Sequence, residues 1–453
     1  MNKTNKMADM PVSKLIIFMG IPMIISMMLQ AVYNIVDSAF VGKIEEVGED
    51  ALNALTLAFP VQMLMIAIAI GTGVGMGAVV SMQLGQKNKK QASLATGNAI
   101  FMAGIIYLVF LLFGIFGVKI YITSQTNNLL VIDMAISYLR ICCVASFGIV
   151  FFSIFEKLLQ ALGNSIYSTI AQVVGAVVNM ILDPIFIYGW FGLPAFGVKG
   201  AAYATVIGQF VSLLLAFVFH IKKNKDIQNS FVYIRPSLSV IKKIYAIGIP
   251  AIIAQALMSV MTYGLNLILG RIDESVVTAY GIYYKIQQFV LFAGFGLRDA
   301  ITPVISFSYG SRNKQRMQEG IKYGLLYTIV IMLIGTVLME LFAGALLEPF
   351  GLSGGTKAIC SSAMRVISIS FVFAGVNIAY QGIFQALESG KESLIISICR
   401  QFLFVLPIAW LFSCIVGDNL NRTWLVWITF IIAEGISCLI SVMLMKKIRD
   451  KII

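Results

Sequence analysis

The sequence predicts an all-α integral membrane protein with twelve transmembrane helices, arranged as two parallel six-helix bundles. The chain has 453 residues, of which 59% are hydrophobic and only 12% are charged, whereas soluble domains carry about 25% charged residues. The apolar runs are too long and too numerous for buried strands, and they lack the alternating pattern of a porin. Together these observations indicate a helical bundle that spans a membrane.

Each predicted span is an apolar run long enough to cross the hydrocarbon core of a bilayer. The first run is too long for the apolar core of a signal peptide, and no small-residue cleavage site follows it. We therefore expect it to remain as a membrane helix. The predicted spans are residues 15–41, 51–83, 93–118, 133–155, 164–189, 195–220, 244–270, 279–308, 323–348, 357–384, 391–417 and 423–445.

The distribution of the 33 Lys and Arg residues predicts how these spans are oriented. With the N-terminus inside, 22 of them fall in inner segments, six in outer loops and five within spans. Because cytoplasmic loops are rich in Lys and Arg, we expect a multi-pass protein of the cell membrane with both termini cytoplasmic. The formal net charge of +12 is then a topology signal, and no nucleic-acid partner is needed to explain it.

The longest polar interval, residues 221–243, divides the spans six and six. We predict an N-terminal bundle at 1–220, a cytoplasmic linker at 221–243 and a C-terminal bundle at 244–453. Two bundles of six spans both begin on the cytoplasmic side, so the repeats are parallel and their interface is expected to hold the substrate near the midplane. This plan is typical of a transporter, and it argues against a channel.

Short matches between the halves support a duplication. GIPMIISMMLQ from Gly20 matches GIPAIIAQALM from Gly248 at an offset of 228. LGQKNKKQ matches YGSRNKQR, and QALGN matches QALES, both at an offset of 225. Because the matches keep one order and nearly one offset, each half is predicted to be a copy of the other.

Polar residues at membrane depth mark a candidate site in the N-terminal half. Asp37 lies near the outer end of the first span, with Tyr33 one turn before it on the same helical face. In the fifth span, Asn179 and Asp183 also lie four residues apart and share a face. Both spans run outward, so the two carboxylates and the amide are predicted at one height. An ionisable residue at this depth usually faces a bundle interior or a wet cavity.

Two further residues complete this predicted site. Pro184 cannot donate to the carbonyl of Met180 and so frees an oxygen for a small hard cation. Thr205 lies about two turns into the sixth span and can add a hydroxyl. The alternative is that Asp37, Asn179 and Asp183 only hydrogen-bond helices together. Helix packing does not need two acids, so we favour a coupling site that takes up H⁺ or Na⁺.

These residues are where the chain resembles a known family. The GIP start, QAVYNIVDSAFVG of the first span, NMILDP of the fifth and GAAYAT of the sixth resemble the multidrug and toxic compound extrusion (MATE) transporters. The six-plus-six duplication and the two basic loops are also similar, and the likeness is nearest the DinF-like branch. The resemblance implies a V-shaped pair of bundles and drug efflux coupled to inward movement of H⁺ or Na⁺.

The resemblance also implies roles for individual residues. In that branch the N-lobe cation site uses an aspartate on helix 1, an asparagine and an aspartate on helix 5, and a threonine on helix 6, which match Asp37, Asn179, Asp183 and Thr205. The other large branch carries acids on helices 7 and 10. The matching stretches here offer Gln255, Asn377, Tyr380 and Gln381 without a carboxylate, which argues against a C-lobe cation site. We expect these four residues and Tyr33 to contribute to a substrate cavity.

The sequence therefore predicts a secondary active multidrug exporter of amphipathic, often cationic compounds, working by alternating access. Its expected partners are small-molecule drugs, organic cations and the lipid bilayer, and we expect a monomer with no cofactor beyond the coupling ion. The alternative is a flippase of lipid-linked precursors with a related fold. Its diphosphate substrate would need a cationic cavity, whereas the midplane of the N-terminal half is acidic.

An enzyme is not expected, because the residues that chemistry would need are missing or misplaced. The six cysteines lie in apolar runs without metal-type spacing. GLSGG at Gly351 fits a nucleophile pattern by letter, but His220, the only histidine, lies at the opposite membrane face. GTGVGMG from Gly71 lies within a span, so Gly71/Gly75 and Gly73/Gly77 are predicted to be helix-packing faces. The roles of Arg298, Asp299, Glu340 and Glu434 stay open between structure and gating or substrate binding.

Overall fold

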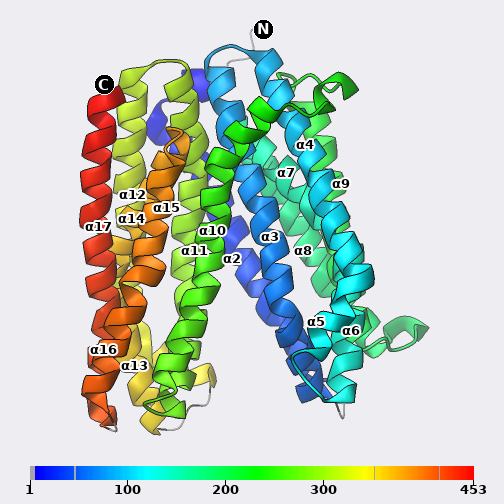
Figure 1. Ribbon diagram of the computed structural model, residues 1–453, viewed down its shortest axis with the longest axis vertical. Helices are drawn as coiled ribbons and strands as arrows, with labels where there is room; N and C mark the ends of the chain where they lie inside the picture. The colour runs from blue at the N-terminus through cyan, green and yellow to red at the C-terminus, as the bar shows by residue number, and fades with distance from the viewer. Residues whose placement is uncertain (1–5, 45–46, 351, 353, 418, 453) are drawn as a thin grey trace. The chain divides into compact units, whose positions relative to one another are not determined.

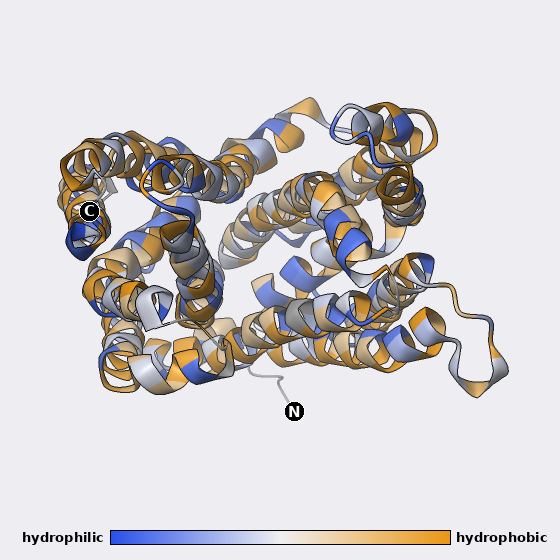
Figure 2. Cartoon of the chain, turned by 90° about the horizontal axis from the view of Figure 1, so that it is seen from below, coloured by the Kyte–Doolittle hydropathy of each residue, from blue (hydrophilic) through white to orange (hydrophobic). Residues whose placement is uncertain are grey.

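The computed structural model describes residues 6–44, 47–350, 352, 354–417 and 419–452, and no β-strand occurs among them (Figure 1). Ten helices in this part of the chain are long and apolar enough to cross a membrane, and two bent helix pairs bring the number to twelve. Hydrophobic residues cover most helices on several sides, as expected for helices that face lipid or one another (Figure 2). The predicted all-α membrane architecture is confirmed.

Both bent pairs form the fourth span of their half. Helices α6 (Leu129–Val144) and α7 (Phe147–Ala161) meet at 46°, and α13 (Gly354–Ser368) and α14 (Phe371–Ala386) meet at 52°. The breaks at residues 145–146 and 369–370 contain neither proline nor glycine. They fall at nearly matching positions of the repeat, so the bend is a property of both copies.

The helices pack into two units, which are described separately. The N-unit comprises Ile25–Ile252, and the C-unit comprises Met1–Ile24 together with Ile253–Ile453. The elements of the N-unit are the second part of α2 (Val12–Gly42), α3 (Gly48–Gly85), α4 (Lys89–Leu112), the π-helix η1 (Phe113–Gly117), α5 (Val118–Thr123), α6, α7, α8 (Ser165–Tyr188), η2 (Trp190–Gly192), α9 (Val198–Lys223), η3 (Phe231–Ile234) and the first part of α10 (Leu238–Leu269).

The C-unit is built in the same order. Its elements are α1 (Lys6–Asp9), the first part of α2, the second part of α10, α11 (Glu274–Gly310), α12 (Lys314–Leu347), η4 (Glu348–Phe350), α13, α14, α15 (Gly390–Ile398), the π-helix η5 (Cys399–Leu403), α16 (Val405–Val416), η6 (Leu420–Arg422) and α17 (Trp424–Ile452). The division of the sequence into bundles at 1–220 and 244–453 rests on the repeat and stays a prediction.

The first span of each half begins in the unit of the other half. In the C-unit, α2 packs so closely on α11 that a Cβ at Gly296 would lie 2.8 Å from the Cα of Ile24. In the N-unit, α10 packs on α3 at Gly71, where a Cβ would collide with Ile252. Gly71 and Gly296 are 225 residues apart, and Ile24 and Ile252 are 228 apart, so the two contacts are repeat-equivalent. The predicted packing role of Gly71 is therefore confirmed.

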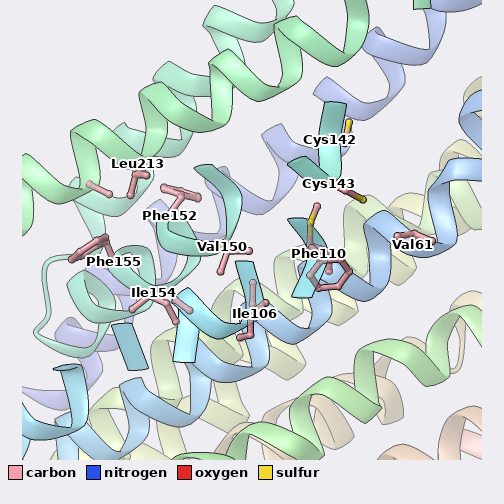
Figure 3. Close-up of a cluster of buried hydrophobic side chains, with 14 of the residues drawn as sticks. Val61, Ile106, Phe110, Cys142, Cys143, Val150, Phe152, Ile154, Phe155 and Leu213 are labelled. Atoms are coloured by element: carbon pink, nitrogen blue, oxygen red, sulfur yellow. The ribbon is translucent and has the colours of Figure 1, made fainter. Parts of the chain in front are cut away.

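The hydrophobic core of the N-unit lies between α3, α4, α6, α7 and α9. Figure 3 shows Phe110 of α4, Cys143 of α6 and Val150 of α7 among its buried side chains. Cys142 and Cys143 are free thiols inside this core, as their apolar surroundings in the sequence predict. Gly73 lets Lys157 of α7 pack against α3, and Lys157 is buried there rather than lying in an inner loop.

Candidate functional site

The predicted coupling residues lie together inside the N-unit. Asp37 comes from α2, Asn179 and Asp183 from α8, and Thr205 from α9. All four are buried, with exposed fractions of 9% for Asp37, 3% for Asn179, 0% for Asp183 and 6% for Thr205. None of the four faces lipid, so their polar groups are directed into the unit.

Helix α2 is fastened to α8 by hydrogen bonds on both sides of Asp37. The Ser26 hydroxyl donates to the amide oxygen of Gln172, 146 residues later. The Tyr188 hydroxyl donates to the carbonyl of Phe40 over 2.7 Å, at a separation of 148 residues. The nearly constant separation shows that the two helices run in parallel and in register. Asp37 therefore lies beside the turn of α8 that carries Asp183.

Helices α8 and α9 approach closely because glycine faces glycine. A Cβ at Gly208 of α9 would lie 2.6 Å from the carbonyl oxygen of Gly175 and 2.9 Å from the Cβ of Asn179. This approach brings the Asn179 amide within 3.5 Å of the Thr205 hydroxyl, to which Nδ2 donates. The same Nδ2 donates to Asp183 Oδ1 over 3.3 Å. Asn179 thus links the acid on α8 to the hydroxyl on α9.

The oxygens of this cluster exceed its donors. Asp37 Oδ1, Asn179 Oδ1 and Asp183 Oδ2 are buried and have no hydrogen-bond partner. Neither carboxylate forms an ion pair with any Lys or Arg in the part of the chain that the structure describes. Asp37 and Asp183 are near enough to interact electrostatically. Three orphaned oxygens fit a proton or a small hard cation, which oxygen ligands hold.

Pro184 lies within α8, and the helix continues through it to Tyr188. The proline has no N–H to donate to the carbonyl of Met180, so this oxygen lacks its helical partner, as the sequence predicts. The helix then ends at Gly189, whose φ of 75° is a left-handed cap.

Several polar residues around the cluster were missed from the sequence. Gln62 of α3 donates to the Tyr138 hydroxyl and to Cys142 Sγ, each over 3.4 Å. Asp37 lies near enough to interact electrostatically with Tyr138 and Cys142, which the sequence did not indicate, as well as with Tyr33, which it did. No spacing in the sequence could join α3 and α6 to α2, because these contacts are tertiary.

A second group of residues was also missed, although the helical period of the polar residues could have revealed it. On α2 the polar residues Ser26, Gln30 and Asp37 share one face, and Gln172 of α8 donates to Gln30 Oε1 over 3.3 Å. On α8, Gln172 lies seven residues before Asn179 and therefore on its face. A search for polar stripes with helical period in both spans would have found Gln30 and Gln172.

In the C-unit the predicted cavity residues make other contacts. Asn377 Nδ2 donates to Glu434 Oε2 over 2.8 Å, and its oxygen accepts from the Ser441 hydroxyl over 2.7 Å. Gln381 donates to the Ser397 hydroxyl over 2.9 Å, while the ring of Tyr380 stacks on Phe384. Gln255 is exposed. A role for Tyr33 and these four residues in binding substrate stays a prediction.

The C-unit also contains a buried ion pair that the sequence did not reveal. Arg400 of η5 donates to Glu434 of α17, with Nη2 2.7 Å and Nε 3.0 Å from Oε1. Arg298 and Asp299, which are adjacent in α11, form a second pair, with Arg298 Nη2 2.8 Å from Asp299 Oδ1. Glu340 accepts a hydrogen bond from Ser368. These contacts assign Arg298, Asp299, Glu340 and Glu434 structural partners.

The Arg400–Glu434 pair borders a cavity of about 50 Å³ within the C-unit. Its walls are aromatic, methionine and aliphatic side chains, and its polar edge includes Gln287 and Gln401. The residues that the sequence assigned to a substrate cavity do not line it: these are Gln255, Asn377, Tyr380 and Gln381.

Comparison with known proteins agrees with this architecture. The MatE family model matches residues 22–185 and 250–411, well over half of the chain. The chain belongs to the MatE family. This membership confirms the resemblance that the motifs of the first, fifth and sixth spans indicate.

Other MatE relatives match almost the full chain. It is 25% identical over 438 residues to the multidrug export protein MepA of Staphylococcus saprophyticus, covering 96% of this chain and 93% of that protein. It is 26% identical over 458 residues to MepA of a Staphylococcus aureus strain, covering 98% and 95%. A solved outward-facing multidrug resistance MATE transporter aligns with 25% identity and a TM-score of 0.91, over 100% of this chain and 99% of that one.

Proposed function

We propose that this MatE protein is a secondary active multidrug exporter, which couples efflux of amphipathic, often cationic compounds to influx of H⁺ or Na⁺. The observation that carries the proposal is the pair of buried carboxylates, Asp37 and Asp183, with unpartnered oxygens and no cationic partner among the described residues. The likeness to proteins named multidrug export protein supports the substrate class. The protein is proposed to act in the cell membrane as a monomer, with both termini cytoplasmic.

The coupling step follows from the electrostatics of the pair. Two carboxylates in a low dielectric repel one another, so a proton or Na⁺ shared between them lowers the free energy of the cluster. Asn179 orients one acid through its amide, and its own oxygen together with Thr205 offers further ligands. The residues present therefore fit either ion, held by oxygen atoms alone.

Ion occupancy drives export only if it favours one conformation over another. Asp37 lies on α2, which carries Gly20 and Pro22 near its inner end and passes from the C-unit to the N-unit after Ile24. A proline within a helix removes one hydrogen bond and provides a bending point. We propose that binding of the ion from outside repacks α2 and displaces substrate outward, and that alternating access then releases the ion to the cytoplasm. The membrane potential adds about 2.3 kcal/mol per 100 mV to the driving force for each positive charge that moves inward.

The test is transport by the purified protein in vesicles with an imposed gradient. A fluorescent organic cation is expected to leave the compartment facing the termini faster when H⁺ or Na⁺ flows in the opposite direction. Imposing one gradient at a time identifies the coupling ion. Equal flux with both gradients and with neither would remove ion coupling from the proposal. Asp273→Asn, an exposed change at a helix cap where Asn also caps, is the matched control and should keep full transport.

A further inference from the structure

The polar interval between the two halves forms a fixed surface on the N-unit rather than a loose connection. The structure places it between α9 and α10, with η3 packed on α4 (Figure 1). Ile227 is buried in the hydrophobic core of the unit, with 4% of its surface exposed. His220 is also buried, and its ring nitrogens lie 3.0 Å from Asn224 Nδ2 and 2.8 Å from Asn229 Oδ1. These side chains tie the interval to the end of α9.

Helix α4 fixes the middle of the same interval. The Ser93 hydroxyl accepts from the backbone N–H of Gln228 over 2.9 Å, and Asn98 Oδ1 accepts from the N–H of Ser237 over 2.7 Å. Gly97 lies directly under the carbonyl of Tyr233, where no side chain would fit. The backbone of residues 227–237 is thereby held near both ends by hydrogen bonds to α4, so the segment follows a defined path over the N-unit.

The tip of this surface is apolar and exposed. Phe231 and Val232 of η3 are 90% and 63% exposed, and Leu238 at the start of α10 is 76% exposed. These exposed fractions show that the described part of the N-unit leaves the three side chains largely uncovered. Exposed apolar groups that lie together often mark a site of contact with a membrane or another protein. Burial of these side chains requires a partner that offers an apolar environment.

The rim of the surface is basic. Residues 221–243 contain six cationic side chains and a single acid, Asp226, whose carboxylate pairs with Lys89 over 2.7 Å. The six cations are Lys222, Lys223, Lys225, Arg235, Lys242 and Lys243, and all are exposed. A partner that covers this rim must therefore carry negative charge.

The neighbouring part of α9 indicates where the lipid ends. Phe210, Leu214, Phe217, Val218 and Ile221 are exposed and share one face of the helix. This lipid-facing stripe ends at Ile221, and the cations begin at the next residue. The interval thus starts at the level where acyl chains give way to headgroups.

We propose that residues 222–243, with Phe231 and Val232 at the tip, bind the anionic lipid surface of the leaflet on the side of the termini. The apolar tip enters the boundary between headgroups and acyl chains, and the six cations contact anionic headgroups. This surface is a docking site for lipid, separate from the Asp37–Asp183 cluster, and it does not depend on which compound the protein exports.

A tryptophan at the tip tests the contact. Phe231→Trp in the full-length protein is reconstituted into phosphatidylcholine vesicles with or without about one-third phosphatidylglycerol, and its emission is taken as the difference from the parent protein. We expect emission at shorter wavelength with the anionic lipid. Quenching should be at least about twofold stronger by lipids brominated near the headgroup than near the chain end, because interfacial segments enter about 5–10 Å.

Two controls make the test specific. Gln86→Trp places the probe at an exposed position of a neighbouring inner loop that has no apolar tip, and it should stay solvent-like. Removing three cations of the rim, by Lys222→Ala, Lys225→Ala and Lys242→Ala together, should abolish the dependence on phosphatidylglycerol. Removing three exposed cations predicted to lie on the outer side, by Lys43→Ala, Lys119→Ala and Lys199→Ala, should leave it intact.

Four results would overturn the proposal. Water-like emission of the Phe231→Trp probe in both vesicle types would show that another partner covers the tip. Equal quenching at positions 86 and 231 would show that the tip has no special contact. Lipid contact with no preference for phosphatidylglycerol would show that anionic headgroups are not recognised. A preference that persists in about 1 M salt, where charges are screened within about 3 Å, would show that it is not electrostatic.

Discussion

The two units treat buried acids in opposite ways. In the N-unit, Asp37 and Asp183 lie close together without a cation among the described residues, and one oxygen of each is unpartnered. In the C-unit, Glu434 is held by Arg400 and Asn377 through four hydrogen bonds from their side chains to its carboxylate. A carboxylate that is already paired with a buried arginine gains little free energy from binding a further cation. Among the described residues, this difference supports the proposal that the N-unit cluster is the site of ion exchange.

Neutralising the N-unit acids should have the largest effect on transport. Asp37→Asn or Asp183→Asn is expected to lower gradient-driven efflux by about 5- to 150-fold, because a coupling energy of about 1–3 kcal/mol is lost. The folded protein should be as stable as the parent or more stable, since a buried unpaired charge has been removed. Vesicle transport and thermal unfolding in detergent measure the two effects. If the Asp37→Asn variant keeps full gradient-driven efflux, Asp37 has no role in ion coupling and the proposed difference between the units is wrong.

Breaking the C-unit ion pair should instead reduce stability. Arg400→Met is expected to lower the free energy of unfolding by about 3–5 kcal/mol, because the Glu434 carboxylate is left buried without its cation. Detergent-induced unfolding followed by circular dichroism gives the change.

A double variant distinguishes the effect of the buried charges from the effect of side-chain volume at this site. Arg400→Met combined with Glu434→Met should recover most of the lost stability, since an apolar pair of similar volume avoids burying charge. If the double variant still exports drug in response to the gradient, Glu434 is not a coupling acid. A double variant that folds but loses ion coupling would contradict the contrast drawn here.

The glycine contact between α8 and α9 tests how tightly the N-unit cluster is held. Gly175→Ala places a Cβ against Ser212 Oγ and 2.5 Å from the carbonyl oxygen of Gly208. We expect a loss of about 1–3 kcal/mol in unfolding free energy from overpacking, with weaker ion coupling as Asn179 moves from Thr205. Gly104→Ala in α4, where a Cβ meets nothing within 4 Å, is the matched control and should be neutral or slightly stabilising.

The smallest expected effect compares equivalent turns of the two repeats. Gly163 of the QALGN turn has a φ of 76°, and its counterpart in QALES, Glu388, has a φ of 58°. A residue with a side chain in the left-handed conformation destabilises the fold by roughly 1–2 kcal/mol. Glycine removes this strain, but it loses about 0.5–1 kcal/mol more backbone entropy on folding, which offsets part of the gain. Glu388→Gly should therefore raise the unfolding free energy by up to about 1 kcal/mol, measured by the same unfolding assay. A clear loss of stability would show that the Glu388 side chain has a role that its counterpart lacks.

The sequence alone determined the spans, because a bilayer requires long apolar runs that are visible without an alignment or a fold. The twelve predicted ranges match the helices and bent pairs of the structure one for one, with ends that differ by up to nine residues, as at the start of α12. It also predicted that Asn179 and Asp183 share a helix face and lie at the height of Asp37, since helical period and direction bear on both. The short matches predicted the repeat that the paired contacts at Gly71 and Gly296 display.

Tertiary structure decided what each buried polar residue touches. The ion pair of Arg400 with Glu434 joins residues 34 apart, and the link from Gln62 to Tyr138 joins residues 76 apart, on helices whose rotation is set by packing. The exchange of the first spans between units likewise depends on which glycine face meets which helix. Periodicity gives the side of a helix on which a residue lies, but not its neighbour, because that neighbour is chosen by the fit of whole surfaces.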